Sequence, residues 1–252
     1  MRSGNPALSA DVFDQFEAGA NDRFDVATSV DTMTIGGTTV KTGVLLGLAT
    51  LTAGFTWQLA VGGGNATPWI FGGAIVGLVF ALITIFKPTA APWTAPLYAL
   101  AEGFFLGGIS AMYASVYQGI VVQAVLLTFG IMFAMLVAFG TGMVQVTERF
   151  RAGIVAATGG IMLVYLVSIV MNMFGSGVPY IHGSGMIGIG FSLFVVIIAS
   201  LNLVLDFDFI QKGSDAGAPK YMEWYGAFGL MVTLVWLYIE ILRLLAKLNS
   251  RD

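Results

Sequence analysis

The sequence predicts an all-α polytopic membrane protein with seven transmembrane helices. Of its 252 residues, 57% are hydrophobic and only 10% are charged, and the mean hydropathy is +0.87. A chain of this composition has too little polar surface to cover a soluble globule. Apolar blocks of bilayer length, about 17–25 residues, recur between short polar breakers, whereas the alternating strands of a membrane β-barrel are not visible.

Residues 1–40 form a polar N-terminal segment before a membrane domain that covers residues 41–252. Acidic side chains outnumber basic ones in this segment, and no apolar core follows a basic start, so it is not a cleavable signal peptide. We expect the segment to be cytoplasmic and largely flexible, because it has few apolar side chains with which to form a core.

The seven predicted spans are separated by stretches rich in glycine, proline and charged residues, which typically interrupt helices. The 33 glycines suit closely packed membrane helices, since small residues allow two backbones to approach each other. In the third span the pair Gly103 and Gly107, four residues apart, suggests such a close contact between helices. The predicted spans cover residues 42–61, 69–86, 95–116, 120–143, 152–174, 186–210 and 224–246.

The distribution of lysine and arginine predicts the orientation, because cytoplasmic loops carry an excess of these residues. A cytoplasmic N-terminus places eight of the 11 inside and none in the three outer loops. The other three, Arg243, Lys247 and Arg251, lie in the last ten residues of the sequence. Seven full crossings place them outside, whereas a last helix that turns back would place all 11 inside. We predict seven crossings, because the segment 224–246 is long enough to span a bilayer.

Four acidic residues, Glu102, Asp206, Asp208 and Glu240, lie within the predicted spans. An ionised carboxylate in hydrocarbon costs a few kcal/mol, so such residues are candidates for a functional site. Asp206 and Asp208 are about 200° apart around a helix and cannot share a face. The two residues must therefore have different roles.

Asp206 lies on a small and polar stripe of the sixth span, one turn after Asn202, which suits the interior of a bundle. A structural hydrogen bond is the alternative, but asparagine would serve that purpose, so we favour a functional role. Asp208 precedes Lys212 by four residues, the favourable order for a helical ion pair. We expect that pair near the cytoplasmic headgroups, with a functional role for Asp208 as the alternative.

Two more acids and one lysine each have two interpretations. Glu240 shares a polar face of the last span with Thr233, and it either pairs with Arg243 three residues later or belongs to a proton-sensitive site. Glu102 is either a site residue or the donor or acceptor of a structural hydrogen bond between helices. Lys87, at the inner end of the second span, either extends to the headgroups or supplies a counter-charge to the acids.

Several segments resemble the Bax-inhibitor membrane proteins, the transmembrane Bax inhibitor motif family, also described as YccA-like. The run DFDFIQKG at 206–213 resembles the acid-bearing sixth helix of that family. LVWLYIEILRLLAKL at 234–248 is similar to its leucine-rich last helix, and ALAEGFFLGGIS at 99–110 is similar to its third helix. RSGNPAL at 2–8 and APKYMEWYGAFGL at 218–230 resemble a bacterial branch with an extended N-terminus.

The resemblance implies seven helices arranged around the last one, and a pair of carboxylates on helices six and seven that share a proton and gate a calcium leak. Asp206 matches the first carboxylate. The second falls on Thr233 or on Glu240, depending on the alignment, and these positions lie about 10 Å apart on one helical face. Lys87 lies near the position at which the family has a basic residue, at the start of the turn between helices two and three. Two acids in a low dielectric do not both ionise cheaply, so the pair titrates as a unit and the leak opens as pH rises.

The predicted function is therefore a pH-sensitive calcium leak channel of the bacterial inner membrane, without cofactor or enzymatic activity. Further candidates along the ion pathway are Glu102, Asn202 and Asp208. The alternative is a membrane interaction protein that transports nothing and regulates a membrane protease or a stress or death pathway through its N-terminal segment.

Other classes of function are disfavoured by the composition. The basic residues are scattered and the net charge is -3, which does not suit binding to nucleic acid. No cysteine is present, which excludes disulfides and thiolate chemistry. An intramembrane aspartyl protease would have glycines before its acid, whereas Leu203, Val204 and Leu205 precede Asp206.

Overall fold

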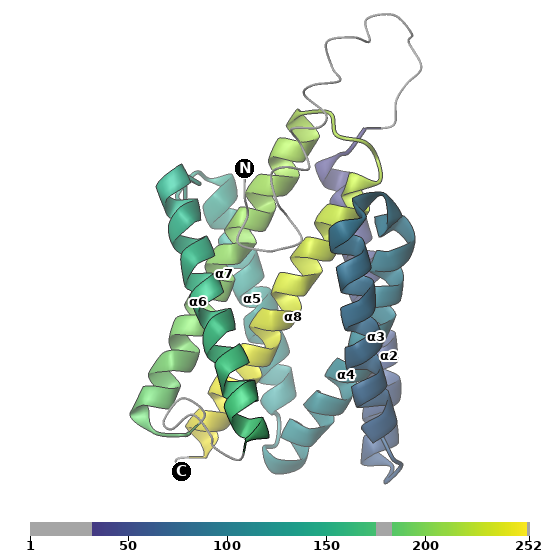
Figure 1. Cartoon of the computed structure of the whole chain (residues 1–252), viewed down its shortest axis with the longest axis vertical. Helices are drawn as coiled ribbons and strands as arrows, with labels where there is room; N and C mark the ends of the chain where they lie inside the picture. Colours follow the sequence, from purple (N-terminus) through teal and green to yellow (C-terminus); the bar gives the residue numbers. More distant parts are fainter. Residues whose placement is uncertain (1–31, 175–182, 251–252) are drawn as a thin grey trace, which may run out of the picture. The chain divides into compact units, whose positions relative to one another are not determined.

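The computed structural model describes residues 32–174 and 183–250, and seven helices in these ranges are long and apolar enough to cross a membrane (Figure 1). This confirms the predicted all-α membrane fold. A short 3-10 helix, η2 (Pro88–Ala90), precedes the third span. The spanning helices are α2 (Ile35–Val61), α3 (Thr67–Phe86), α4 (Ala91–Val116), α5 (Ile120–Gly140), α6 (Glu148–Met173), α7 (Met186–Asp215) and α8 (Met222–Asn249).

The first helix, α2, begins at Ile35, which is earlier than the predicted start at residue 42 and lies within the N-terminal segment 1–40. Thr34 supplies the helix cap, because its extended backbone lets the side-chain oxygen Oγ1 accept a hydrogen bond of 3.0 Å from the Gly37 N–H. Residues 1–31, for which we expect flexibility, lie outside the described residues.

The last helix, α8, is a single unbroken helix of 28 residues. A helix of that length is about 42 Å long, more than the ~30 Å of a bilayer core, so α8 is long enough to cross the membrane and has no break at which it could turn back. The buried share of the most apolar stretch is 61% in α8 and 56% in α7, against 17–39% in the other five spans. Among the spans, α7 and α8 are therefore the most buried.

The chain divides into two compact units. The first consists of residues 1–112 and 206–232, and the second of residues 113–205 and 233–252. Because α7 and α8 each contribute one part to either unit, these two helices belong to both.

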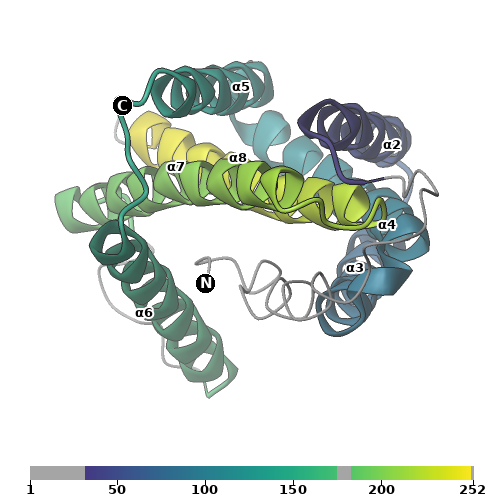
Figure 2. The ribbon, with the colours of Figure 1, turned by 90° about the horizontal axis from the view of Figure 1, so that it is seen from above.

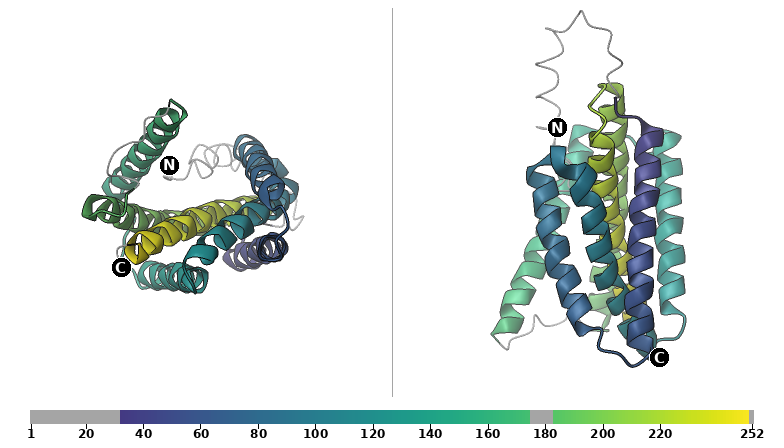
Figure 3. Two further views of the ribbon diagram at one scale, coloured as in Figure 1. Left: turned by 90° about the horizontal axis from the view of Figure 1, so that it is seen from below. Right: turned by 90° about the vertical axis from the view of Figure 1, so that its right-hand side faces the viewer.

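Within the first unit, α2, α3 and α4 pack closely through glycines (Figures 2 and 3). A Cβ atom on Gly103 or Gly107 of α4 would overlap the backbone of α2 at Ala49 or Ala53. The predicted close contact at this pair of glycines is therefore confirmed. On the other side of α4, a Cβ atom on Gly73 of α3 would lie 2.5 Å from the Ala101 carbonyl oxygen.

The outer faces of several helices carry large apolar side chains. Phe71 of α3, Leu126 and Phe133 of α5 and Leu163 of α6 are 66%, 68%, 66% and 63% exposed. In water such a surface would promote association, whereas in a bilayer it is the face that contacts the lipid chains.

Candidate functional site

Asp206 of α7 is completely buried, with 0% of its surface exposed. The residues around it in the helix, from Leu203 to Phe207, are buried as well. The acid is therefore enclosed by the protein and is not in contact with cytoplasmic solvent. The side chain occupies the environment that we expect for a functional acid, since an enclosed carboxylate depends on its protein surroundings to stay ionised.

Asn202 joins α7 to α6 within the second unit. Its Nδ2 donates one hydrogen bond of 2.9 Å to Oγ1 of Thr158 and another of 2.8 Å to the Ile198 carbonyl. Its carbonyl oxygen Oδ1 is buried and accepts no hydrogen bond from the described residues. This oxygen is therefore a free acceptor inside the bundle.

Asp208 forms the helical ion pair with Lys212 that the sequence predicts, with 2.8 Å between Oδ2 and Nζ. The side chain of Asp208 is 14% exposed and that of Lys212 is 36% exposed. The pair lies in the last turns of α7, so the charge of Asp208 is compensated close to the end of the helix.

Glu240 of α8 is 1% exposed, and its oxygen Oε2 has two partners in the second unit. Tyr165 of α6 donates a hydrogen bond of 2.7 Å from its hydroxyl, and Arg243 donates one of 2.9 Å from its guanidinium. Arg243 also donates to the Tyr165 hydroxyl at 2.8 Å and lies 5.0 Å from the centre of that ring. The predicted pairing of Glu240 with Arg243 is thus present. The other oxygen, Oε1, is buried and has no donor among the described residues.

Thr233 is 3% exposed and lies two turns before Glu240 on the same face of α8. A threonine hydroxyl does not ionise at physiological pH. If the second acid of the family pair is sought on this face, Glu240 is the only ionisable one of the two candidates, and it is already neutralised by an arginine.

Lys247, in the last turn of α8, is buried and has two acceptors on the first turns of α7. Its Nζ donates to the Gly188 carbonyl and to Oγ of Ser192, both at 2.9 Å. Arg243 and Lys247 are two of the three basic residues that contradict the charge rule if α8 crosses fully. Both side chains have partners within the protein. These partners stabilise the two positive charges even if this end of α8 does not face the cytoplasm.

Glu102 and Lys87 both lie in the first unit and have no ion pair among the described residues. Glu102 of α4 faces α3, because a Cβ atom on Gly77 would lie 3.0 Å from its Oε2. Lys87 is exposed at the C-terminal end of α3, as expected for a lysine that extends to the headgroups.

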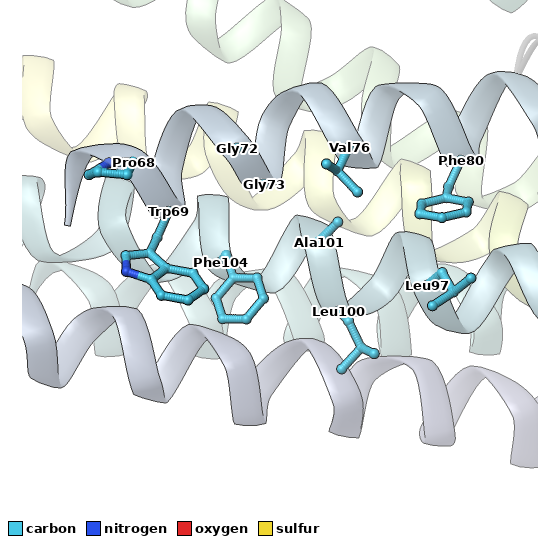
Figure 4. Close-up of a pocket in the computed structure, with 10 residues that line it drawn as sticks. All are labelled: Pro68, Trp69, Gly72, Gly73, Val76, Phe80, Leu97, Leu100, Ala101 and Phe104. Carbon is cyan, nitrogen blue, oxygen red and sulfur yellow. The ribbon is translucent and has the colours of Figure 1, made fainter.

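The groove between α3 and α4 has a volume of about 480 Å³ and is lined without any charged side chain (Figure 4). Trp69 and Phe104 close one end, and Phe80 and Leu97 lie at the other. Cations in proteins are held by oxygen atoms, so this apolar groove does not suit an ion pathway.

Glu223 is a buried acid that sequence reasoning missed, because the last span was predicted to begin one residue after it. Its side chain is 0% exposed and is bound by Thr34, Lys41 and Lys220. The spacing of three residues from Lys220 was the local signal that could have identified it. The other partners, Thr34 and Lys41, are 189 and 182 residues away in the chain.

A family model described as "Bax inhibitor 1 like" matches residues 5–250, almost the entire chain. The chain belongs to the Bax inhibitor family. No curated protein and no solved structure matches the chain significantly. Membership in the Bax inhibitor family, together with the seven spans, establishes an integral membrane protein that resides in a lipid bilayer.

Proposed function

We propose that the protein is a pH-sensitive ion leak with Ca²⁺ as the permeant ion, and that Asp206 is the group whose proton controls it. The complete burial of Asp206 within a membrane helix carries the proposal. A protonated carboxyl group is compatible with apolar neighbours, whereas an ionised one needs water, a hydrogen-bond donor or a cation. Loss of the proton would therefore favour entry of water and cations, and the leak would increase as pH rises.

Glu240 is the carboxylate on α8 in this proposal. Its contacts with Arg243 and Tyr165 support a role as a fixed charge that these two partners hold in place. Its oxygen Oε1 and Oδ1 of Asn202 are buried acceptors without donors among the described residues. Hard oxygen atoms of this kind suit Ca²⁺, so both belong to the proposed ion pathway, together with Glu102 and Asp208.

The described residues contain no group of three or more acids, histidines or cysteines that could hold a metal ion. Tight binding would in any case oppose a leak, since a permeant ion has to leave each site easily. In the proposed pathway the ion meets single carboxylates, separated by amide or hydroxyl oxygens. Such weak sites support passage of Ca²⁺.

The experiment that tests the proposal is Ca²⁺ flux from proteoliposomes at pH 6, 7 and 8. We expect the flux of the native protein to increase with pH, and the dependence on pH to disappear in Asp206→Asn. Asp215→Asn is the matched control, because it removes an exposed acid of the same helix that lies outside the proposed pathway. A native flux that does not change with pH, or an unchanged pH profile in Asp206→Asn, would refute the proposal.

For location, we propose the bacterial inner membrane with a cytoplasmic N-terminus. The excess of lysine and arginine on that side supports this orientation. This orientation places Arg243 and Lys247 outside, against the charge rule. Their hydrogen-bond partners within the protein stabilise both cations there, which also supports the orientation.

A second candidate is an interaction protein that regulates a membrane protease or a stress pathway without transport. The observation in its favour is that two residues of the N-terminal segment are bound near the start of the last helix: Met33 to Ala218 in the preceding loop, and Thr34 to Glu223 in its first turn. A partner that pulled on this segment would act directly on α8. In this case Ca²⁺ flux would be absent at every pH.

A further inference from the structure

We propose that Glu223, Thr34, Lys41 and Lys220 form a latch that fastens the start of α2 to the start of α8, and that opening of this latch is a step in opening the leak. The second half of this inference depends on the proposed leak function, whereas the first half does not. We call these four residues the Glu223 latch.

The Glu223 carboxylate is enclosed, and each of its oxygens has a partner on α2 or next to it. Oε1 accepts hydrogen bonds from the backbone N–H of Thr34 at 2.9 Å and from its hydroxyl at 2.8 Å. Lys220 lies 3.3 Å from the same oxygen, and Lys41 forms an ion pair with Oε2. A single acid therefore holds both the cap residue of α2 and a lysine two turns into that helix.

Backbone contacts next to the Glu223 latch also join the segment before α2 to the loop before α8. Gly37 faces the Glu223 carboxylate, and a Cβ atom at this position would overlap it. The Met33 N–H donates a hydrogen bond of 2.7 Å to the Ala218 carbonyl, and Thr32 forms an antiparallel bridge with Pro219. The segment before α2 thus runs alongside the loop that leads into α8.

The start of α2 depends on these polar contacts because it has few apolar ones. In the first ten residues of α2 the buried side chains are Thr38 and Thr42, and the first buried apolar side chain is Leu45. At the latch the side chains of Lys41 and Lys220 are 17% and 43% exposed. Water can therefore replace the lysines at the carboxylate, so the latch can open while α8 stays folded.

The Glu223 latch lies at the start of the helix that carries two of the candidate gating residues. Glu223 lies in the first turn of α8, and the same unbroken helix carries Thr233 and Glu240. A helix moves as a rigid element, so release of its first turn allows the whole helix to shift or rotate. The latch therefore holds α8 in one position, and its opening permits another.

A disulfide that locks the latch provides the decisive test. The chain has no cysteine, so the double variant Thr32→Cys with Pro219→Cys would contain one defined pair. Facing residues of an antiparallel bridge have Cα atoms about 4.5–5.5 Å apart, within the ~4.4–6.8 Å that a disulfide requires. We expect oxidation to lower Ca²⁺ flux at pH 8 at least ~10-fold, and a reducing agent to restore it. Each single cysteine variant is a control that should not respond to oxidation.

Equal flux in the oxidised and reduced double variant would overturn the link between the latch and the leak. If the reduced and native proteins have no flux at any pH, the proposed leak function fails, and hydrogen exchange decides the latch. We expect the amides of Gly37 and Thr38 to exchange at least ~10-fold faster in Glu223→Gln than in the native protein, with no change in Asp208→Asn. Unchanged exchange at these amides in Glu223→Gln would overturn the latch itself.

Discussion

Removal of the guanidinium that neutralises Glu240 is expected to destabilise the last helix, and the size of the effect follows from the contacts. Arg243→Met keeps most of the aliphatic stem of the side chain but removes the hydrogen bonds to Glu240 Oε2 and to the Tyr165 hydroxyl, of 2.9 and 2.8 Å. Glu240 is 1% exposed, so its charge would remain buried with Tyr165 as the one donor left among the described residues. Loss of one partner from a buried ion pair typically costs ~3–5 kcal/mol.

The expected loss is at the low end of this range, about 3 kcal/mol, because the Arg243 side chain is itself 31% exposed and part of its charge is already solvated. The free energy of unfolding can be measured by SDS titration of the protein in mixed micelles, with the native protein as reference. Tyr165→Phe is a milder change, since it keeps the ion pair and removes only the hydroxyl, which donates to Glu240 and accepts from Arg243; it should cost ~1.5–3 kcal/mol.

The double variant Arg243→Met with Glu240→Gln tests the cause. A neutral amide needs no counter-charge, so the double variant should regain more than half of the stability that Arg243→Met loses. If the double variant is as unstable as the single one, the loss does not come from an uncompensated carboxylate. If Arg243→Met loses less than ~1 kcal/mol, the ion pair is not what holds Glu240, and the view of Glu240 as a fixed charge is refuted.

Three other changes have defined outcomes. Gly103→Leu should destabilise the protein by several kcal/mol in the same SDS titration, because its side chain would overlap α2, whereas Gly72→Leu should be nearly neutral because no atom lies within 4 Å of a Cβ there; similar losses for both would contradict the glycine packing. Lys247→Met should cost ~1–3 kcal/mol by leaving the Gly188 carbonyl and Ser192 hydroxyl without their donor, and Ser192→Ala, which leaves the lysine one acceptor, should cost less. Deletion of residues 1–35 should lower the unfolding free energy relative to deletion of residues 1–31, because only the longer deletion removes the Thr34 cap and its bonds to Glu223; equal stability of the two deletions would contradict this role of Thr34.

The spans and the local ion pairs could be predicted from the sequence because both depend on residues that are close together in the chain. A run of apolar residues has to match the bilayer, which fixes the length of each helix wherever it packs. The pairs of Asp208 with Lys212 and of Glu240 with Arg243 follow from helical spacing alone. The face of α4 that approaches α2 was also visible as the glycine pair Gly103 and Gly107.

The partners of the buried acids could not be predicted, because they come from distant parts of the chain. Tyr165 reaches Glu240 across 75 residues, and Thr34 reaches Glu223 across 189. The early start of α2 was missed for a related reason. Its first turns contain glycines and threonines and are polar enough to be assigned to the preceding segment, and the bonds of Thr34 and Lys41 to Glu223 of α8 explain why they are ordered.

The contacts of Arg243 and Lys247 also have a consequence for biogenesis. Their partners Tyr165, Gly188 and Ser192 precede α8 in the chain, so they have already been synthesised when the last helix emerges from the ribosome. Alone in lipid, the C-terminal half of α8 would carry two cations and one carboxylate with little to neutralise the excess charge. Its stable insertion therefore requires the fifth and sixth spans to be in the membrane first, which makes the order of translation the order of assembly.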